Sequence, residues 1–233
     1  MSVWLVASAA PVVLWILWLR WRNASIKERA LAGRRALASG DLDEAAAIFE
    51  ELRREPAAAT MARELLAWTR MRQEWLADAI AVELEQHERD TRRPSAGALP
   101  TKLELARLHA LRADLPAARQ WADDARRLAE RARGVNRRTA DAQLLVVDAL
   151  IACREGAPDA ARALLLRDWG RFETLEGGGG WRAEACLLRG FLDGAAGAGV
   201  EVWLGLDEAS RARVRWMSAE WPELRAFLDA YDR

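Results

Sequence analysis

A helix–turn–helix pattern that recurs along the chain limits the possible folds more than any other feature of the sequence. Copies are readable at Ala36–Phe49, Leu111–Ala122 and Cys153–Leu165, and a degenerate copy lies at Trp75–Ile80. Each copy contains the end of an apolar helix, a tight turn and the start of a second helix with an alanine near its beginning. A single pair of helices cannot bury its apolar face alone, so stacked pairs are expected to share one continuous core.

Small residues mark the places where the two helices of each pair are expected to approach closely. The equivalent positions in the four copies are Ala45, Ala79, Ala118 and Ala161. In the first copy, Gly33 adds a second small residue and Gly40 can adopt the left-handed backbone of a helix end. Asp41 and Glu44 have the spacing of a capping box. The intervals between the alanines increase along the chain, so the later units are expected to carry longer loops.

The first copy resembles the tetratricopeptide repeat family. The residues near the family's small, turn, small, aromatic and terminal-proline positions are Gly33, Gly40, Ala45, Phe49 and Pro56. The resemblance covers roughly Lys27 to Trp169 and is clearest in the first unit. It implies an all-α protein, an α-solenoid of antiparallel helix pairs whose concave surface binds protein partners.

Three regions are expected: an anchor at 1–22, a solenoid at 23–169 and a C-terminal helical cap with glycine-rich links at 170–233. The helix pairs of the solenoid are predicted near Ile26–Arg54, Thr60–Arg89, Lys102–Arg133 and Arg138–Asp168. A cap is needed because the open end of a solenoid exposes an apolar face. The spacing of the C-terminal aromatic residues favours a core over a partner pocket; they are Trp203, Trp216, Trp221, Phe227 and Tyr231.

The opening run Met1–Leu19 carries no charged side chain. As a helix, Val3–Leu19 would extend about 25 Å, which is within the range of a single membrane crossing. A cleaved secretory signal is the alternative, but no basic residue precedes Arg20 and no small-residue cleavage site follows the run. The side chains expected at the membrane interfaces are Trp4, Trp18, Arg20, Trp21 and Arg22.

Positive charge is concentrated on one flank of this run, at Arg20, Arg22, Lys27 and Arg29. The positive-inside rule therefore predicts a single-pass protein with its C-terminal domain in the cytoplasm. The dominance of alanine and arginine indicates a GC-rich bacterial genome, so the expected location is a bacterial inner membrane. An anchor, a basic flank and cytoplasmic repeats together resemble adaptors of the lipopolysaccharide assembly protein B type. The four-cysteine metal module of that family is missing here, so the resemblance implies no metal role.

Catalytic chemistry is not indicated by any motif. The net charge is zero and the pI is about 6.8, which argues against a dedicated nucleic-acid-binding protein. His87, His109, Cys153 and Cys186 do not have the spacing of metal ligands. Gly177–Gly180 lacks the Lys-Ser/Thr that follows a phosphate-binding loop. The sequence therefore predicts no cofactor and no enzymatic activity.

A binding groove is better supported than a catalytic site. In the repeat register, the side chains presented by the inner helices are Arg34, Trp68, Arg72, Arg107, Leu150 and Arg154. Guanidinium groups pair with carboxylates in a bidentate way, so the groove is expected to bind an acidic or C-terminal peptide segment of a partner protein. A solvated face of arginine–glutamate pairs is an equally open alternative.

A second basic region lies in the third and fourth units. Its arginines are Arg126, Arg127, Arg131, Arg133, Arg137 and Arg138. Such a patch could contact anionic lipid or RNA, each side chain contributing about 1 kcal/mol near a lipid surface. Arginines that only complement a helix C-terminus are the simpler explanation. The whole sequence thus predicts a membrane-anchored scaffold that assembles or regulates an inner-membrane complex, with a lipid- or RNA-binding module as the alternative.

Overall fold

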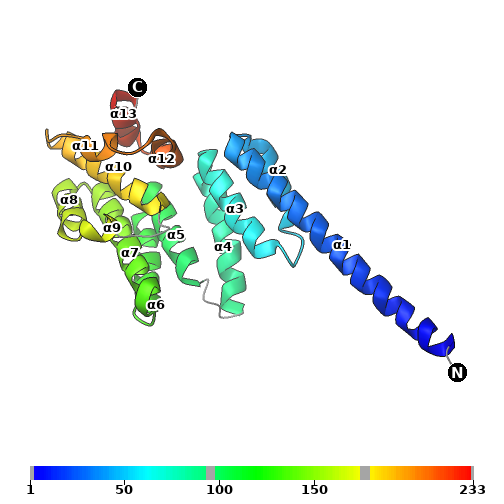
Figure 1. The fold of residues 1–233 in the computed structure, drawn as a ribbon. Coiled ribbons are helices and arrows are strands. Elements are labelled where there is room, and N and C mark those ends of the chain that lie inside the picture. Colours follow the sequence, from blue (N-terminus) through cyan, green and yellow to red (C-terminus); the bar gives the residue numbers. More distant parts are fainter. Residues whose placement is uncertain (1–2, 93–97, 174–178, 232–233) are drawn as a thin grey trace. The chain divides into compact units, whose positions relative to one another are not determined.

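The computed structural model describes residues 3–92, 98–173 and 179–231, and every regular element within these ranges is a helix (Figure 1). The described part of the chain contains no strand, which confirms the prediction of an all-α fold. The chain divides into two compact units, Met1–Thr69 and Arg70–Arg233.

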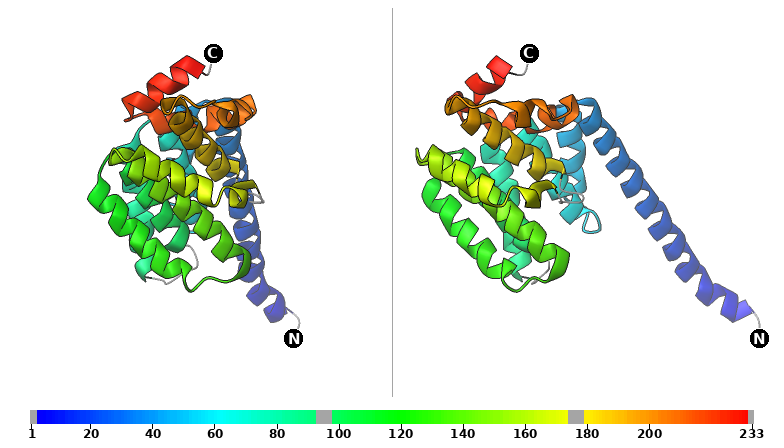
Figure 2. Two further views of the ribbon diagram at one scale, coloured as in Figure 1. Left: turned by 90° about the vertical axis from the view of Figure 1, so that its left-hand side faces the viewer. Right: turned by 60° about the vertical axis from the view of Figure 1, so that its left-hand side comes forward.

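The first unit contains α1 (Val3–Ser39), α2 (Leu42–Leu52) and the start of α3 (Ala59–Arg72). The second unit contains the end of α3 and the following elements: α4 (Leu76–Arg92), α5 (Ala98–Leu111), α6 (Leu115–Ala129), α7 (Gly134–Arg154), α8 (Pro158–Arg167), α9 (Gly170–Glu173), α10 (Gly179–Ala195), α11 (Glu201–Leu204), α12 (Glu208–Val214), the 3-10 helix η1 (Arg215–Ser218) and α13 (Pro222–Tyr231). The helices α1 to α8 follow one another in the order of the four predicted pairs, although α1 begins well before Ile26. In the second compact unit, α5, α6 and α7 pack against one another and α8 packs against α7 (Figure 2).

α1 is longer than the pattern predicted. It contains 37 residues and passes without a break through Arg22–Ile26, where the anchor was expected to end and the first repeat helix to begin. No proline or glycine lies in that stretch, so nothing there interrupts the helical hydrogen bonds. Among the described residues, no helix is both long and apolar enough to cross a membrane. The span at Met1–Leu19 stays a prediction from the sequence.

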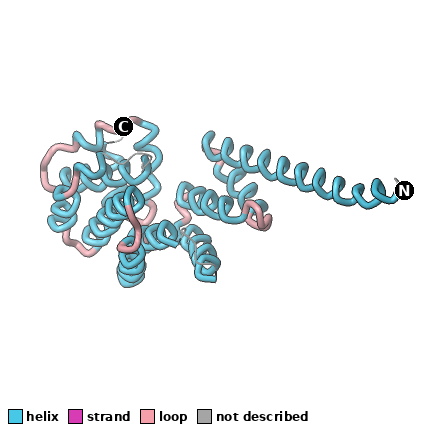
Figure 3. Tube along the Cα trace, turned by 60° about the horizontal axis from the view of Figure 1, so that its bottom comes forward, coloured by secondary structure: helices cyan, strands magenta, loops and turns pink. Residues whose placement is uncertain are grey.

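A residue with left-handed backbone separates the two helices of every pair, visible as the short loops of Figure 3. These residues are Gly40 (φ 86°), Glu74 (φ 62°), Ala113 (φ 59°) and Gly156 (φ 76°). In each turn the next backbone N–H donates to the carbonyl five residues earlier; the donors are Asp41, Trp75, Asp114 and Ala157. This is the Schellman geometry of a helix end. The degenerate second repeat therefore has the same turn as the other three, although Glu74 stands where the first and fourth repeats have glycine.

The small residues lie where close helix approach was predicted. Ala45, Ala79, Ala118 and Ala161 are all fully buried. A Cβ built on Gly33 would lie only 2.8 Å from Cε1 of Phe49, so the α1/α2 pair depends on a glycine at this crossing. The Asp41 carboxylate caps α2 by accepting a hydrogen bond from the Glu44 N–H at 3.2 Å. These contacts confirm the local pairing predicted for the first repeat.

The C-terminal helices share the core of the second unit. α10 packs against α7, α8, α11, α12 and α13. Trp203, Trp216, Trp221 and Phe227 are buried, as predicted. Tyr231 is exposed, so its assignment to the core was wrong; it lies at the end of the last described helix, where fewer elements surround it.

Candidate functional site

A buried arginine joins the repeats of the second unit to the C-terminal helices. Arg107 of α5 donates hydrogen bonds to the carboxylates of Glu104 on the same helix and Glu184 on α10. Its guanidinium lies 4.7 Å from the ring centroid of Trp181 and 4.9 Å from that of Trp216. Both ring distances suit cation–π attraction, so Arg107 binds α5, α10 and η1 together.

Burial governs the electrostatics of this cluster. Burial disfavours the charge of Arg107, but the nearby Glu104 and Glu184 carboxylates outweigh that effect and raise its pKa. Burial raises the pKa of Glu184 to about 7, although the Arg107 guanidinium opposes that shift. Nε of Arg107 and Oε2 of Glu184 are both buried with no hydrogen-bond partner among the described residues. The pair is therefore strongly desolvated and incompletely satisfied, a costly arrangement to break on one side only.

The predicted groove is corrected at two positions. Arg107 and Leu150 were expected to face a partner, but both are buried. Helices added after the fourth pair explain this burial, because α10 supplies Glu184 and Trp181 to Arg107 and packs against α7, the helix of Leu150. Arg34 is exposed on α1 and Trp68 is half-buried on α3, both in the first unit. Arg72, in the second unit, is half-buried at the end of α3.

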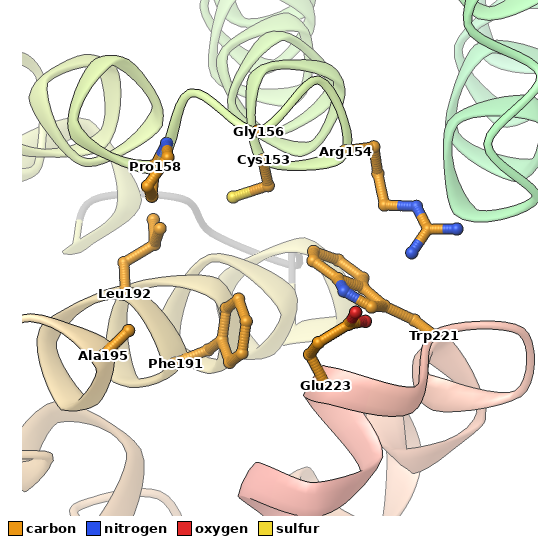
Figure 4. A pocket seen from close by; sticks show the side chains of 9 residues that line it. All are labelled: Cys153, Arg154, Gly156, Pro158, Phe191, Leu192, Ala195, Trp221 and Glu223. Atoms are coloured by element: carbon orange, nitrogen blue, oxygen red, sulfur yellow. The ribbon is translucent and has the colours of Figure 1, made fainter.

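Arg154, the last predicted groove residue, contacts the C-terminal segment of the chain. Its guanidinium lies 5.0 Å from the Trp221 ring centroid, and its Nη2 donates to the Glu220 backbone carbonyl at 3.3 Å. Phe191 of α10 meets the same indole edge-on, with centroids 5.3 Å apart. Figure 4 shows Arg154 and Phe191 on either side of Trp221. Burial lowers the pKa of Arg154, and the charges of Glu223 and Glu220 partly offset this.

Two further ion pairs hold the same segment, which we call the C-terminal strap and define as Arg215–Tyr231. Nε of Arg112 donates to Oε2 of Glu220 at 3.3 Å, at the turn between α5 and α6. Nη2 of Arg225 donates to Oε2 of Glu74 at 2.7 Å, at the turn between α3 and α4. The strap thus contacts the α3–α4 turn, the α5–α6 turn and, through Arg154, the end of α7.

A pocket of about 460 Å³ lies beside Trp221 (Figure 4). Its walls come from the end of α7, the turn before α8, α10 and the start of α13; they are Cys153, Arg154, Gly156, Pro158, Phe191, Leu192, Ala195, Trp221 and Glu223. Burial raises the pKa of the Cys153 thiol to about 12, so this group is protonated at neutral pH and is a poor nucleophile. The pocket can hold an apolar side chain but offers no acid–base pair for catalysis.

Three of the six arginines of the basic patch are paired with carboxylates. Arg126 binds both oxygens of Asp148, at 2.9 and 3.0 Å, and also pairs with Asp123. Arg127 pairs with Asp124, and Arg137 pairs with Asp141 at 2.8 Å. Arg131, Arg133 and Arg138 remain exposed. Acidic residues spaced three or four positions from each arginine on the same helix were the sequence signal for this pairing.

The strap contacts could not be predicted from the sequence because they join residues far apart in the chain. The Glu220–Trp221–Pro222 turn was predicted as part of a cap, and no local pattern in the sequence indicates its contacts with Arg112 and Arg154.

Within the described ranges, no group of three or more His, Cys, Asp or Glu side chains could hold a metal ion. Comparisons of the chain with protein-family models, with curated proteins and with solved structures find no match.

Proposed function

We propose that the protein is a membrane-anchored, tetratricopeptide-like adaptor that holds a segment of a partner protein near a bacterial inner-membrane complex. The observation that carries this proposal is the repeated helix pair with its recurring left-handed turn at Gly40, Glu74, Ala113 and Gly156. Stacked helix pairs of this kind offer extended surfaces for protein segments. The arginines at the helix ends of the second unit, Arg112 and Arg154, supply charge for recognition.

The anchor is proposed on the sequence. Met1–Leu19 is uncharged and is followed by the basic flank from Arg20 to Arg29. A cytoplasmic repeat domain is the topology that this asymmetry favours. In α1 the helix runs from the apolar run into the first repeat, an arrangement that would keep the repeats within a few helical turns of the membrane surface.

Binding is favoured over catalysis because the reactive side chains are in unreactive settings. Both cysteines are free thiols, and burial raises the pKa of Cys153 and of Cys186. Burial, with the charge of Lys102, lowers the pKa of His87, whose ring packs edge-on against Trp121. The lipid- or RNA-binding alternative is weaker, since Arg126, Arg127 and Arg137 are already paired with carboxylates.

Topology and partner capture test the proposal together. A reporter fused after Arg233 should behave as cytoplasmic, and replacing Arg20, Arg22, Lys27 and Arg29 should scramble the orientation. Cross-linking in intact membranes, followed by mass spectrometry, should recover a defined inner-membrane partner with the wild-type chain. An alkaline phosphatase fusion that is active in the periplasm contradicts the topology, and cross-links only to lipid or RNA contradict the adaptor function.

A further inference from the structure

The arginines at the ends of α5 and α7 already hold an acidic–aromatic pair, which belongs to the chain itself. Arg112 binds the Glu220 carboxylate, while Arg154 binds the Glu220 carbonyl and stacks on the Trp221 indole. The two contacted residues are adjacent in the strap. The surface therefore recognises a carboxylate followed directly by an aromatic ring, and it does so with a segment that is not part of the repeats.

The polar contacts that hold this pair are weak. Both arginine bonds to Glu220 are 3.3 Å long, and the side chains of Arg112 and Glu220 are about 40% exposed. Exposed ion pairs of this kind contribute little to stability because water and salt screen them. The hydrogen bonds from Arg112 and Arg154 therefore hold the Glu220–Trp221 turn only weakly to α5 and α7.

An open pocket lies beside the buried Trp221 ring. It has a volume of about 460 Å³ and is lined by Trp221 and by residues of the α7–α8 turn, so a second side chain has space next to the indole. Nε of Arg154 is buried without a hydrogen-bond partner among the described residues. In contrast, Leu224 and Leu228 of α13 are almost completely buried, so the rest of the strap is firmly attached. Within the turn, Glu220 is exposed and held by the two long polar contacts, whereas Trp221 is held by packing against Phe191 and Arg154.

We propose that the Arg112–Arg154 surface is the recognition site for a partner segment with an acidic residue next to an aromatic residue, and that the Glu220–Trp221 turn occupies this site in the absence of the partner. The inference rests on the proposed adaptor function and names the chemistry of its partner. A partner segment places its carboxylate on Arg112 and its ring against Arg154, and the Glu220–Trp221 turn moves aside. The pocket beside Trp221 gives the displaced or incoming ring space to move.

Charge complementarity supports this occupant. Arg112 and Arg154 both face the Glu220 position, so a basic segment would be repelled there. An apolar segment without a carboxylate would leave Arg112 without the anionic partner that Glu220 supplies. An acidic–aromatic segment offers a carboxylate to Arg112 and a ring to Arg154, so it replaces the contacts of Glu220 and Trp221 with equivalent ones.

A peptide with the sequence of Arg215–Tyr231, labelled with fluorescein, is the probe, and its anisotropy is measured with the full chain in detergent micelles. Glu220→Arg repels Arg112 and Arg154 and opens the site from an exposed position that the fold tolerates. If the internal turn occupies the site nine-tenths of the time or more, this variant should bind the probe about tenfold more tightly than the wild type. Adding Arg112→Glu to the same variant should abolish binding.

Asp229→Arg is the matched control, because it makes the same charge change on an exposed position of α13 away from the contacted turn. It should bind the probe as the wild type does. A second opening variant, Trp221→Ala, is checked by circular dichroism and used only if its helix content is unchanged. Equal probe affinity for the wild type, Glu220→Arg and Asp229→Arg, or no binding to any of them, overturns the inference. If the cross-links to a partner protein are found but the probe affinities of these variants are equal, the adaptor function is retained. Only the proposal that the Glu220–Trp221 turn occupies the recognition site is then rejected.

Discussion

Nη1 of Arg107 donates a hydrogen bond to Oε1 of Glu184, and this bond joins α5 to a helix whose residue is 77 positions further along the chain. The ion pair lies between the Trp181 and Trp216 rings, with Glu104 as a second carboxylate. This ion pair attaches the C-terminal helices to Arg107, a side chain that the repeat pattern predicted to contact a partner protein. One arginine of the predicted groove is therefore paired with a carboxylate of the same compact unit.

Arg107→Ala should destabilise the protein strongly, because it leaves the Glu184 carboxylate buried without its cation. Removal of one partner of a buried pair typically costs about 3–5 kcal/mol. The free energy of unfolding, measured by urea titration with circular dichroism, checks the value. Arg34→Ala, at an exposed site on α1, is the matched control and should change stability by less than about 0.5 kcal/mol. Similar losses for the two variants would show that the pair is not a main tie between α5 and α10.

The raised pKa of Glu184 makes stability depend on pH. The pKa of Glu184 is about 7 in the folded state, whereas the ordinary pKa of a glutamate is 4.5, so the folded form binds more protons between these two pH values. The contribution of Glu184 to stability is therefore greatest below about pH 4.5, decreases as pH rises to 7 and then levels off. Glu184→Gln removes this titration while keeping an acceptor for Arg107. The wild type should lose stability relative to Glu184→Gln between pH 5 and pH 8, and parallel pH profiles would contradict the assignment.

Gly33→Leu should weaken the α1/α2 pair. A Cβ alone would already come within 2.9 Å of two Phe49 ring carbons and 3.0 Å of the Ile48 Cγ2 atom, so a larger side chain must push the helices apart. Overpacking of this kind typically costs about 1–3 kcal/mol. Ala38→Leu adds the same side chain at an exposed site of α1 and serves as the control. Thermal unfolding followed by circular dichroism should separate the two, and equal melting temperatures would refute the close crossing.

Ala113→Gly should stabilise the protein, unlike most alanine-to-glycine changes. Ala113 has a φ of 59°, a left-handed conformation that costs a non-glycine residue roughly 1–2 kcal/mol. Part of this gain is lost to the greater freedom of glycine in the unfolded chain, so a net gain of about 0.5–1 kcal/mol is expected. Ala117→Gly, inside α6, is the control and should instead cost about 1 kcal/mol. Urea titration measures both, and a loss of stability in Ala113→Gly would show that the turn does not strain its alanine.

Much of the repeat architecture was predictable because its signals are local. Helix periodicity, the alanines at the crossings and the turn residues act over distances of a few positions, and they located all four pairs. The second repeat, near Trp75, shows the limit of this approach. Its turn contains Glu74 where the first and fourth repeats have glycine, so its sequence is degenerate although its backbone has the same left-handed turn. The environment of Arg154 was also hidden, because its neighbours Trp221 and Glu220 follow more than sixty residues later.

The sequence by itself determined the helical class, the pairing of successive helices and the apolar, uncharged N-terminal run, since each of these depends on residue type and short-range spacing. Only the tertiary structure decided which arginines are available to a partner. Arg34 is exposed and Arg107 is buried by Glu184 and two tryptophans, although both arginines have the same place in the repeat pattern. Arg154, which was predicted for the same groove, is stacked on Trp221. The physical reason is that the burial of a side chain depends on which helices from distant parts of the chain pack over it. A local sequence pattern does not contain this information.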